Sequence, residues 1–143
     1  MGFMLPLSDG ELDGYWQGVT NELNDGSKIL LVAHEGEAIV GAVQLSLCMK
    51  PNGAHRAEIQ KLLVHSQFRQ RGYGRALMVA AELRAKDMKR TLLVLDTEEG
   101  SVAEGLYERI GYARLGTIPR FAASPHDAPG TPPRGSTFFY REL

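Results

Sequence analysis

Apolar residues recur at helical spacing in three segments of the chain, and each segment predicts a helix. The first opens with capping-box spacing at residues 8–11 and ends near Asp25-Gly26. The second covers about residues 72–88. The third opens with the same spacing at Ser101 and runs to Ile110, where Gly111 is placed as a left-handed stop. The apolar faces comprise Leu12, Tyr15, Trp16, Val19 and Leu23, expected to face the core, and, in the second helix, Ala76, Val79, Ala80 and Leu83.

Short aliphatic runs between the helices predict strands. Residues 29–33 and 38–47 form a predicted hairpin across Glu35-Gly36, and the Pro-Asn-Gly sequence at 51–53 turns the chain again. A third strand covers about residues 57–64. Regular alternation along it places Glu58, Gln60, Leu62 and Val64 on one face and Ile59, Lys61 and Leu63 on the other.

Three further strands complete the prediction. Residues 91–95 form an apolar run typical of a strand covered on both faces, and Asp96 is expected to end it. Strands at about 113–118 and 136–141 enclose a Pro/Gly-rich stretch at 119–135, and loops of that length are usually functional or mobile. The order of helices and strands predicts a single α/β domain with a mixed sheet over residues 1–143.

Composition narrows the function classes. A chain of 143 residues with 43% hydrophobic and 23% charged residues is typical of one globular domain. Its net charge of -1 provides no long-range attraction for nucleic acid or a membrane surface, so we expect neither as a partner. The apolar start lacks a basic flank, and no stretch is long enough to span a bilayer. We therefore expect a soluble cytoplasmic protein with any anion site confined to a local cluster.

The cysteine and histidine residues do not indicate a metal site. The single cysteine, Cys48, lies in an apolar run, where a buried inert thiol is favoured over a nucleophile and a reducing compartment is favoured over an oxidising one. The four histidines have no metal-ligand spacing, and surface or turn positions explain them better. They are His34, His55, His65 and His126.

A basic turn that contains glycine follows the third strand and leads into the second helix. Glycines permit close approach of the backbone to a ligand, and the amide groups and dipole of a helix start attract phosphate. Taken alone, the segment could equally be a plain turn with solvated arginines. The candidate cofactor-binding residues in this segment are Leu62, Leu63, Val64, Arg69, Gln70, Arg71, Gly72, Tyr73, Gly74 and Arg75.

Two ordered motifs favour the ligand-binding interpretation. Arg69-x-x-Gly72-x-Gly74 resembles the acetyl-CoA pyrophosphate loop of GNAT acetyltransferases, and Ala103-x-x-Leu106-Tyr107-x-x-x-Gly111-Tyr112 resembles that family's later helix end. The glycine spacing fits neither the dinucleotide fingerprint nor a P-loop. The resemblance implies a GNAT fold, acetyl-CoA as cosubstrate and transfer of an acetyl group to a primary amine.

The resemblance extends to the tabtoxin-resistance branch over nearly the whole chain. It includes Gln44-Leu45-Ser46-Leu47-Cys48, Leu95-Asp96-Thr97-Glu98 and Gly100-Ser101-Val102-Ala103-Glu104, and it implies that Ser101 also contacts the cofactor. Against a complete GNAT domain the chain looks N-terminally short, because the family's first strand and helix come before its start. Gly100 stands where the family often has Asn, and Ser66 where it often has Pro.

The resemblance also suggests catalytic roles. Glu58 and Asp96 are candidates to deprotonate the amine, although Glu58 could instead pair with a neighbouring Arg56 or Lys61, and Asp96 could merely cap a loop. Tyr107 is the candidate proton donor to the departing thiolate, the alternative being a half-buried helix aromatic. Backbone N–H groups near Val64 would polarise the thioester carbonyl.

The function expected from these residues is N-acetylation of a small-molecule amine, such as an amino-acid-like toxin or metabolite, in a detoxifying role. Two alternatives remain open at this point. The chain could be a catalytically weak acyl-CoA-binding module, which the short start and Gly100 would favour, or a protein-lysine acetyltransferase. A homodimer is a further expectation, because a second subunit could cover an exposed sheet edge.

Overall fold

The computed structural model describes the backbone of residues 9–143 and the side chains of residues 17–143. Its elements agree in order with the predicted helices and strands. The helices are α1 (Asp9–Asp25), α2 (Tyr73–Asp87) and α3 (Val102–Arg109), with short 3₁₀ turns at Pro51–Gly53 and Ser66–Phe68. The strands are β1 (Lys28–Glu35), β2 (Ala38–Leu47), β3 (Arg56–Val64), β4 (Leu92–Glu98), β5 (Ala113–Ala122) and β6 (Arg134–Glu142).

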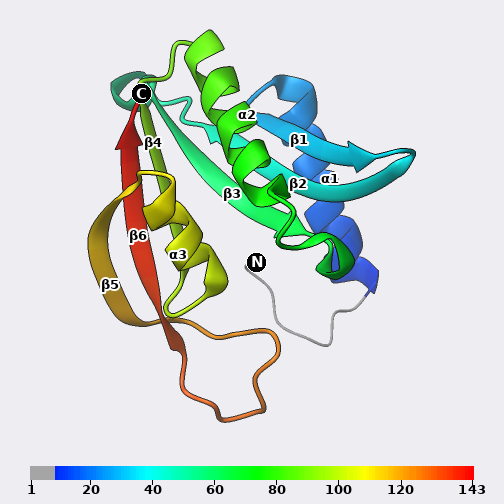
Figure 1. The fold of residues 1–143 in the computed structure, drawn as a ribbon, viewed down its shortest axis with the longest axis vertical. Coiled ribbons are helices and arrows are strands. Elements are labelled where there is room, and N and C mark those ends of the chain that lie inside the picture. The colour runs from blue at the N-terminus through cyan, green and yellow to red at the C-terminus, as the bar shows by residue number, and fades with distance from the viewer. Residues whose placement is uncertain (1–8) are drawn as a thin grey trace.

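All six strands form one sheet in the order β1-β2-β3-β4-β6-β5. Every neighbouring pair is antiparallel except β3 and β4, which are parallel and joined by α2. The predicted mixed α/β fold is therefore confirmed. Figure 1 shows α2 and α3 on the viewer's face of the sheet and α1 behind it, so the sheet is covered by helices on both faces.

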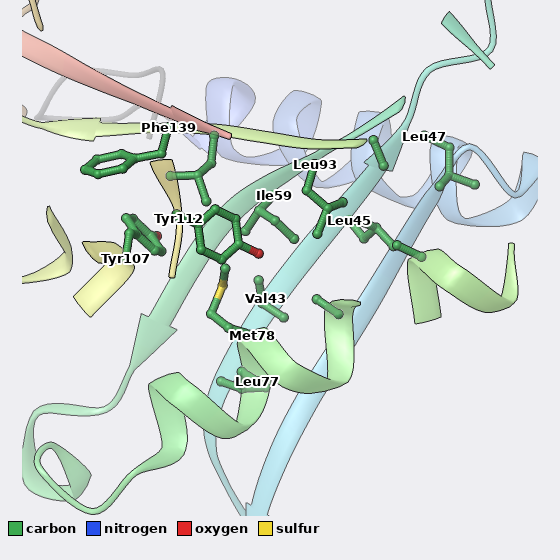
Figure 2. Close-up of a cluster of buried hydrophobic side chains, with 14 residues drawn as sticks. Val43, Leu45, Leu47, Ile59, Leu77, Met78, Leu93, Tyr107, Tyr112 and Phe139 are labelled. Carbon is green, nitrogen blue, oxygen red and sulfur yellow. The ribbon is translucent and has the colours of Figure 1, made fainter. Parts of the chain in front are cut away.

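The main core lies between the sheet and the two helices on the viewer's face. Leu77 and Met78 of α2 face Val43, Leu45 and Ile59 of the sheet in Figure 2, which also shows an aromatic group at one end of the cluster. In that group the ring of Tyr107 lies 6.0 Å from that of Tyr112 and 5.7 Å from that of Phe139. Tyr107 is therefore held in place by packing as well as by the helix that carries it.

The described part of α1 agrees with its predicted orientation. Val19 is buried, as expected for the core-facing stripe of this helix. Ser8 of the capping box and the side chains of Leu12, Tyr15 and Trp16 lie outside the described residues.

The predicted apolar face of α2 is wrong. Val79 and Leu83 are 46% and 58% exposed, and Ala76 and Ala80 are also exposed. The buried face consists of Leu77, Met78, Ala81 and Ala85. This helix carries two overlapping apolar stripes. The stripe that packs on the sheet is the one with Leu77 and Met78, because these two side chains bury a large apolar area, and the small alanines of the same stripe let the helix approach the sheet closely.

The predicted alternation along β3 is also wrong beyond Gln60. Gln60 pairs with Gln44 and Leu63 with Ala42, so Lys61 and Leu62 stand opposite one residue of β2. Lys61 has the left-handed φ of 52°, which identifies a β-bulge. The extra residue shifts the alternation, so that Leu62 and Val64 pack against the core on the same side as Ala57 and Ile59.

Three strands extend further at one or both ends than the sequence predicts. Asp96 does not end β4, because Asp96, Thr97 and Glu98 all pair with β6. Within the apolar run, Leu93 and Leu95 on one face are buried, whereas Leu92 and Val94 on the other face are only partly buried, so the strand is less enclosed than the run predicts. The stretch at 119–135 is a loop only from 123 to 133, because β5 continues to Ala122. Pro119 is tolerated there since β5 is an edge strand.

Glu104 fixes the start of α3. Ser101 is the N-cap and accepts a hydrogen bond from the Glu104 amide, while the Glu104 carboxylate accepts from the Gly100 amide, from the Thr137 hydroxyl at 3.1 Å and from Arg114. These contacts, the Gly100 amide foremost, hold the pKa of Glu104 below its usual value. Gly111, with φ of 97°, stops the helix as predicted.

We predict that Glu104→Gln destabilises the protein at neutral pH and not in acid. A carboxyl whose pKa is lower in the folded state stabilises it above the unfolded pKa of about 4.3, and that contribution disappears as pH falls through the folded value. Thermal unfolding of both proteins between pH 7 and pH 3 checks this. A gap in unfolding temperature that stays constant over that range would contradict it.

Candidate active site

The candidate site lies where β3 and β4, which are paired at one end, diverge from each other. Their parallel ladder has three pairs and ends at Glu58 with Val94, because β4 stays paired with β6 along its whole length. Figure 1 shows the two strands diverging from this end, with α3 beside the gap. Beyond Glu58, the backbone groups of β3 that face β4 have no partner in this ladder. The bulge at Lys61 lies within that stretch.

Two cavities occupy the region and share the wall formed by Leu62, Leu63 and Ala103. The basic cavity, of about 620 Å³, lies between the β3–α2 turn and α3. The acidic cavity, of about 650 Å³, lies between β3, β4 and the end of β5. Nine of the ten candidate cofactor-binding residues of the turn line the basic cavity: Leu62, Leu63, Val64, Arg69, Gln70, Gly72, Tyr73, Gly74 and Arg75.

The two glycines of the turn serve different purposes. Gly72 has a φ of 85°, a conformation that side chains rarely adopt, and a Cβ there would meet no atom within 4 Å. A Cβ on Gly74 would lie 3.3 Å from Leu106 Cδ2, so this glycine lets the start of α2 approach α3. No side chain in the described part of the chain caps α2, which leaves its first amide groups available to an anion.

Arg71 and Ser101 are the two predicted cofactor residues that do not line either cavity. Arg71 Nη1 lies 3.4 Å from a carboxylate oxygen of Glu35, and its guanidinium lies over the ring of Phe68. Tyr73 donates to the same Glu35 at 2.6 Å, which raises the pKa of that phenol. Ser101 is occupied as the N-cap of α3 and shares a hydrogen bond with Thr97.

The three predicted catalytic residues come together on the acidic cavity. Glu58 reaches it from β3, Asp96 from β4 and Tyr107 from α3. Asp96 Oδ2 accepts a hydrogen bond of 2.7 Å from Ser136 on β6. The loop-cap alternative for Asp96 does not apply, because Asp96 lies within β4. Tyr107 is a helix aromatic that is more deeply buried than expected, with 5% of its surface exposed.

Burial determines the acidity of Tyr107. Loss of water around the phenol, reinforced by the negative charge of Asp96, raises its pKa to about 12. An unperturbed phenol has a pKa of about 10. Tyr107 therefore stays protonated throughout the physiological range and is a hydrogen-bond donor at the edge of the cavity.

Several residues of the acidic cavity were not identified as site residues from the sequence. Lys61 enters it because of the bulge, and Lys28 from the neighbouring edge of the sheet. Phe121, Ser124 and Pro125 wall it from the end of β5 and the loop that follows. The Pro/Gly-rich composition of 119–135 was the only sequence signal for that wall, and the bulge had none.

Two kinds of feature are not found among the described residues. No helix there is long and apolar enough to cross a membrane. No group of three or more His, Cys, Asp and Glu side chains in that part of the chain could hold a metal ion.

Comparison with known proteins identifies the family. A family model described as "Acetyltransferase (GNAT) domain" matches residues 26–114. An acetyltransferase of Yersinia enterocolitica is 32% identical over 115 residues, which cover 79% of this chain and 74% of the relative.

Solved structures show the same fold. A ribosomal-protein-alanine N-acetyltransferase from Brucella melitensis is similar with a TM-score of 0.76 and 24% identity, over 92% of this chain and 78% of that one. An acetyltransferase from Salmonella typhimurium, solved with acetyl-CoA, has a TM-score of 0.74 and 17% identity, over 92% and 73% of the two chains. With motifs, cavities and sheet in agreement, the chain belongs to the GNAT acetyltransferase family.

Proposed function

We propose that the protein transfers the acetyl group of acetyl-CoA to a primary amine of a small molecule. The observation that carries the proposal is that the basic and acidic cavities are adjacent and share three lining residues. A basic turn with exposed helix amides lies on one side of the wall formed by Leu62, Leu63 and Ala103, and Glu58, Asp96 and Tyr107 lie on the other. A donor held on the basic side can thus present its reactive end to an amine on the acidic side.

The basic cavity fits the phosphate-bearing part of the donor. Gly72 leaves open space above the turn, Gly74 brings the start of α2 close to α3, and Arg69 and Arg75 add positive charge where pyrophosphate would lie. The apolar wall of Val64 and Leu106 suits an uncharged pantetheine arm. When bound, acetyl-CoA supplies an activated acetyl thioester with a good leaving group.

The residues of the acidic cavity would accept the proton that the attacking amine must lose. The amine must attack as a neutral group, and an alkyl ammonium has a pKa of about 10.4, so a base must accept a proton. Glu58 and Asp96 are the carboxylates placed to do so. As the new N–C bond forms and the C–S bond breaks, the proton released by the amine balances the one that the thiolate gains. The backbone amides of β3 beyond Glu58, where the ladder with β4 has ended, are suited to stabilise charge on the carbonyl oxygen.

The raised pKa of Tyr107 refines its expected role. A free thiol has a pKa of about 8.5, so a phenol whose pKa is raised to about 12 is the weaker acid, and complete proton transfer from it to the thiolate costs free energy. A hydrogen bond from the phenol to the departing sulfur carries no such cost. Tyr107 is therefore a hydrogen-bond donor to the sulfur, and the amine is the source of the proton that the thiolate receives.

The shape of the acidic cavity favours a small acceptor over a protein. Residues 121–125 close one side of it, where a peptide would need an open groove. The similarity of the 95–98 and 100–104 segments to tabtoxin-resistance acetyltransferases supports detoxification of an amine-bearing compound as the biological role. A homodimer that covers an edge of the sheet belongs to the same proposal.

Acetyl-CoA binding tests the basic cavity. We predict that Arg69→Ala and Arg75→Ala each weaken CoA binding about tenfold, as expected for loss of one charge-assisted hydrogen bond. Arg71→Ala should have a smaller effect, because Glu35 already holds that guanidinium. Arg84→Ala, at the far end of α2, is the control. Calorimetric titration with CoA measures the difference, and equal affinity in all four variants would place the phosphates elsewhere.

Turnover tests the acidic cavity. We predict amine-dependent release of free thiol from acetyl-CoA across a panel of amino acids, dipeptides, polyamines and aminoglycosides. At least one of Glu58→Gln and Asp96→Asn should lower kcat by about 10²- to 10⁴-fold, as for loss of a general base. Glu37→Gln, at the exposed hairpin tip, is the matched control. CoA binding without thiol release for any amine would favour the binding-module alternative.

The hydrogen bond from Tyr107 is tested by the value of kcat and by its pH dependence. Tyr107→Phe should lower kcat by about 10- to 100-fold, the range of one hydrogen bond to a charged group. Because its pKa is raised to about 12, ionisation of Tyr107 should not lower the rate of the native enzyme below about pH 11. The pH profiles of both proteins with one amine check this, and a fall in native activity between pH 8 and 10 that Tyr107→Phe abolishes would contradict it.

A further inference from the structure

One wall of the acidic cavity is apolar. It consists of the end of β5 and the loop that follows, and it is lined by Phe121, Ala122, Ala123 and Pro125. Phe121 is the largest of these residues, and 49% of its surface is exposed. Because contact between apolar surface and water is unfavourable, a ligand group that covers this ring gains affinity. The wall is thus suited to bind an apolar part of the acceptor.

Strand pairing places Phe121 close to Asp96. Asp96 of β4 stands opposite Phe138 of β6, and the side chains of such a pair lie on the same face of the sheet. The hydrogen bond of 2.7 Å from Ser136 to Asp96 agrees with this face. The ring of Phe121 lies 5.3 Å from that of Phe138, at an interplanar angle of 84°. An amine bound at Asp96 can therefore reach Phe121 with a short carbon chain.

Arg134 holds the loop part of the wall in place. Its Nη1 lies 2.6 Å from Glu98 at the end of β4, and its Nη2 lies 2.7 Å from Asp127 in the loop. The guanidinium thereby ties the loop to the strand that carries Asp96. Exposed ion pairs contribute little stability singly, but two carboxylates on one planar guanidinium fix the geometry. A wall that is already formed costs a ligand little free energy of ordering.

The charged groups of the cavity have opposite charges near them. Among the described residues, two lysines and three carboxylates line it: Lys28, Lys61, Glu58, Asp96 and Glu98. Glu22 of α1 pairs with Lys28 at 3.0 Å, and Glu98 pairs with Arg134. The remaining lysine is attracted by the other two carboxylates. A second charge on the acceptor would compete with these partners, whereas an apolar substituent would not.

We propose that the acceptors are primary amines with an apolar alkyl or arylalkyl substituent, and that Phe121 determines this specificity. The inference rests on the proposed acetyl transfer, because it assigns the acceptor class of the same cavity. The amine lies beside Asp96 and Glu58, and the substituent lies along the wall from Phe121 to Pro125. Polyamines and aminoglycosides are poorer acceptors, because a second ammonium would lose water against apolar side chains.

A series of linear amines tests the acceptor class. We measure kcat/KM at saturating acetyl-CoA for ethylamine, butylamine, pentylamine and phenethylamine. Each added methylene that reaches the wall should raise kcat/KM about fourfold, as expected for burial of one methylene group. Putrescine, in which an ammonium replaces the terminal methyl group of pentylamine, should be poorer than pentylamine by about 10- to 100-fold.

Variants of Phe121 test whether this side chain is responsible. Phe121→Ala should lower kcat/KM about tenfold for pentylamine and phenethylamine by raising KM, with little change for ethylamine. Activity on ethylamine shows in the same assay that the variant is folded. Phe121→Leu keeps an apolar side chain and should retain most of the preference. Leu115→Ala is the matched control, because Leu115 is exposed on the same strand but does not line the cavity.

Three results would overturn the inference and leave the acetyltransferase proposal standing. They are equal kcat/KM along the amine series, faster acetylation of putrescine than of pentylamine, and a preference for long amines that survives in Phe121→Ala. Acetylation of amino acids or aminoglycosides with no activity on any amine of the series has the same meaning.

A binding measurement covers the case in which no amine is acetylated, which would count against the proposed function itself. N-acetylethylamine and N-acetylpentylamine are titrated calorimetrically into the protein saturated with CoA. Tighter binding of N-acetylpentylamine that Phe121→Ala abolishes supports the role of Phe121 without any turnover. Equal binding of the two compounds, or a difference that the substitution leaves unchanged, overturns it.

Discussion

The parallel pairing of β3 with β4 stops after three residue pairs, and the site depends on that interruption. β4 continues along β6, whereas β3 turns away with β2, so neither strand can follow the other. The gap opens two connected cavities and leaves the backbone of β3 available to a ligand. Backbone groups without hydrogen-bond partners destabilise a fold unless water or a ligand can reach them. Helix α3 borders the gap, with Tyr107 lining the acidic cavity and Leu106 the basic one.

The electrostatics follow from the same geometry. A chain with a net charge of -1 cannot attract an anionic cofactor at long range, so the attraction must come from local arginines and the amides at the start of α2. Across the shared wall the sign reverses, and Asp96 beside the buried Tyr107 makes that side suitable for an amine. The two cavities thus differ in charge although Leu62 and Leu63 line both of them.

Sequence reasoning succeeded where the signal is local. Capping residues and the glycine at 111 marked α3, and the glycine turn together with the helix end at 103–112 indicated the family. It failed where the structure depends on contacts between distant segments. Alternation cannot mark a bulge such as that at Lys61, two overlapping stripes on α2 cannot show which one meets the sheet, and nothing near Arg71 reveals that Glu35 holds it.

A crystal structure with CoA and an acetylated amine tests the central claim most directly, because it shows both sides of the shared wall at once. The account predicts pyrophosphate on the amides of residues 72–75, sulfur within hydrogen-bond distance of the Tyr107 hydroxyl, and the amide nitrogen beside Glu58 or Asp96. Pyrophosphate bound away from the turn, or sulfur remote from Tyr107 with the acetyl group outside the gap between β3 and β4, would contradict it.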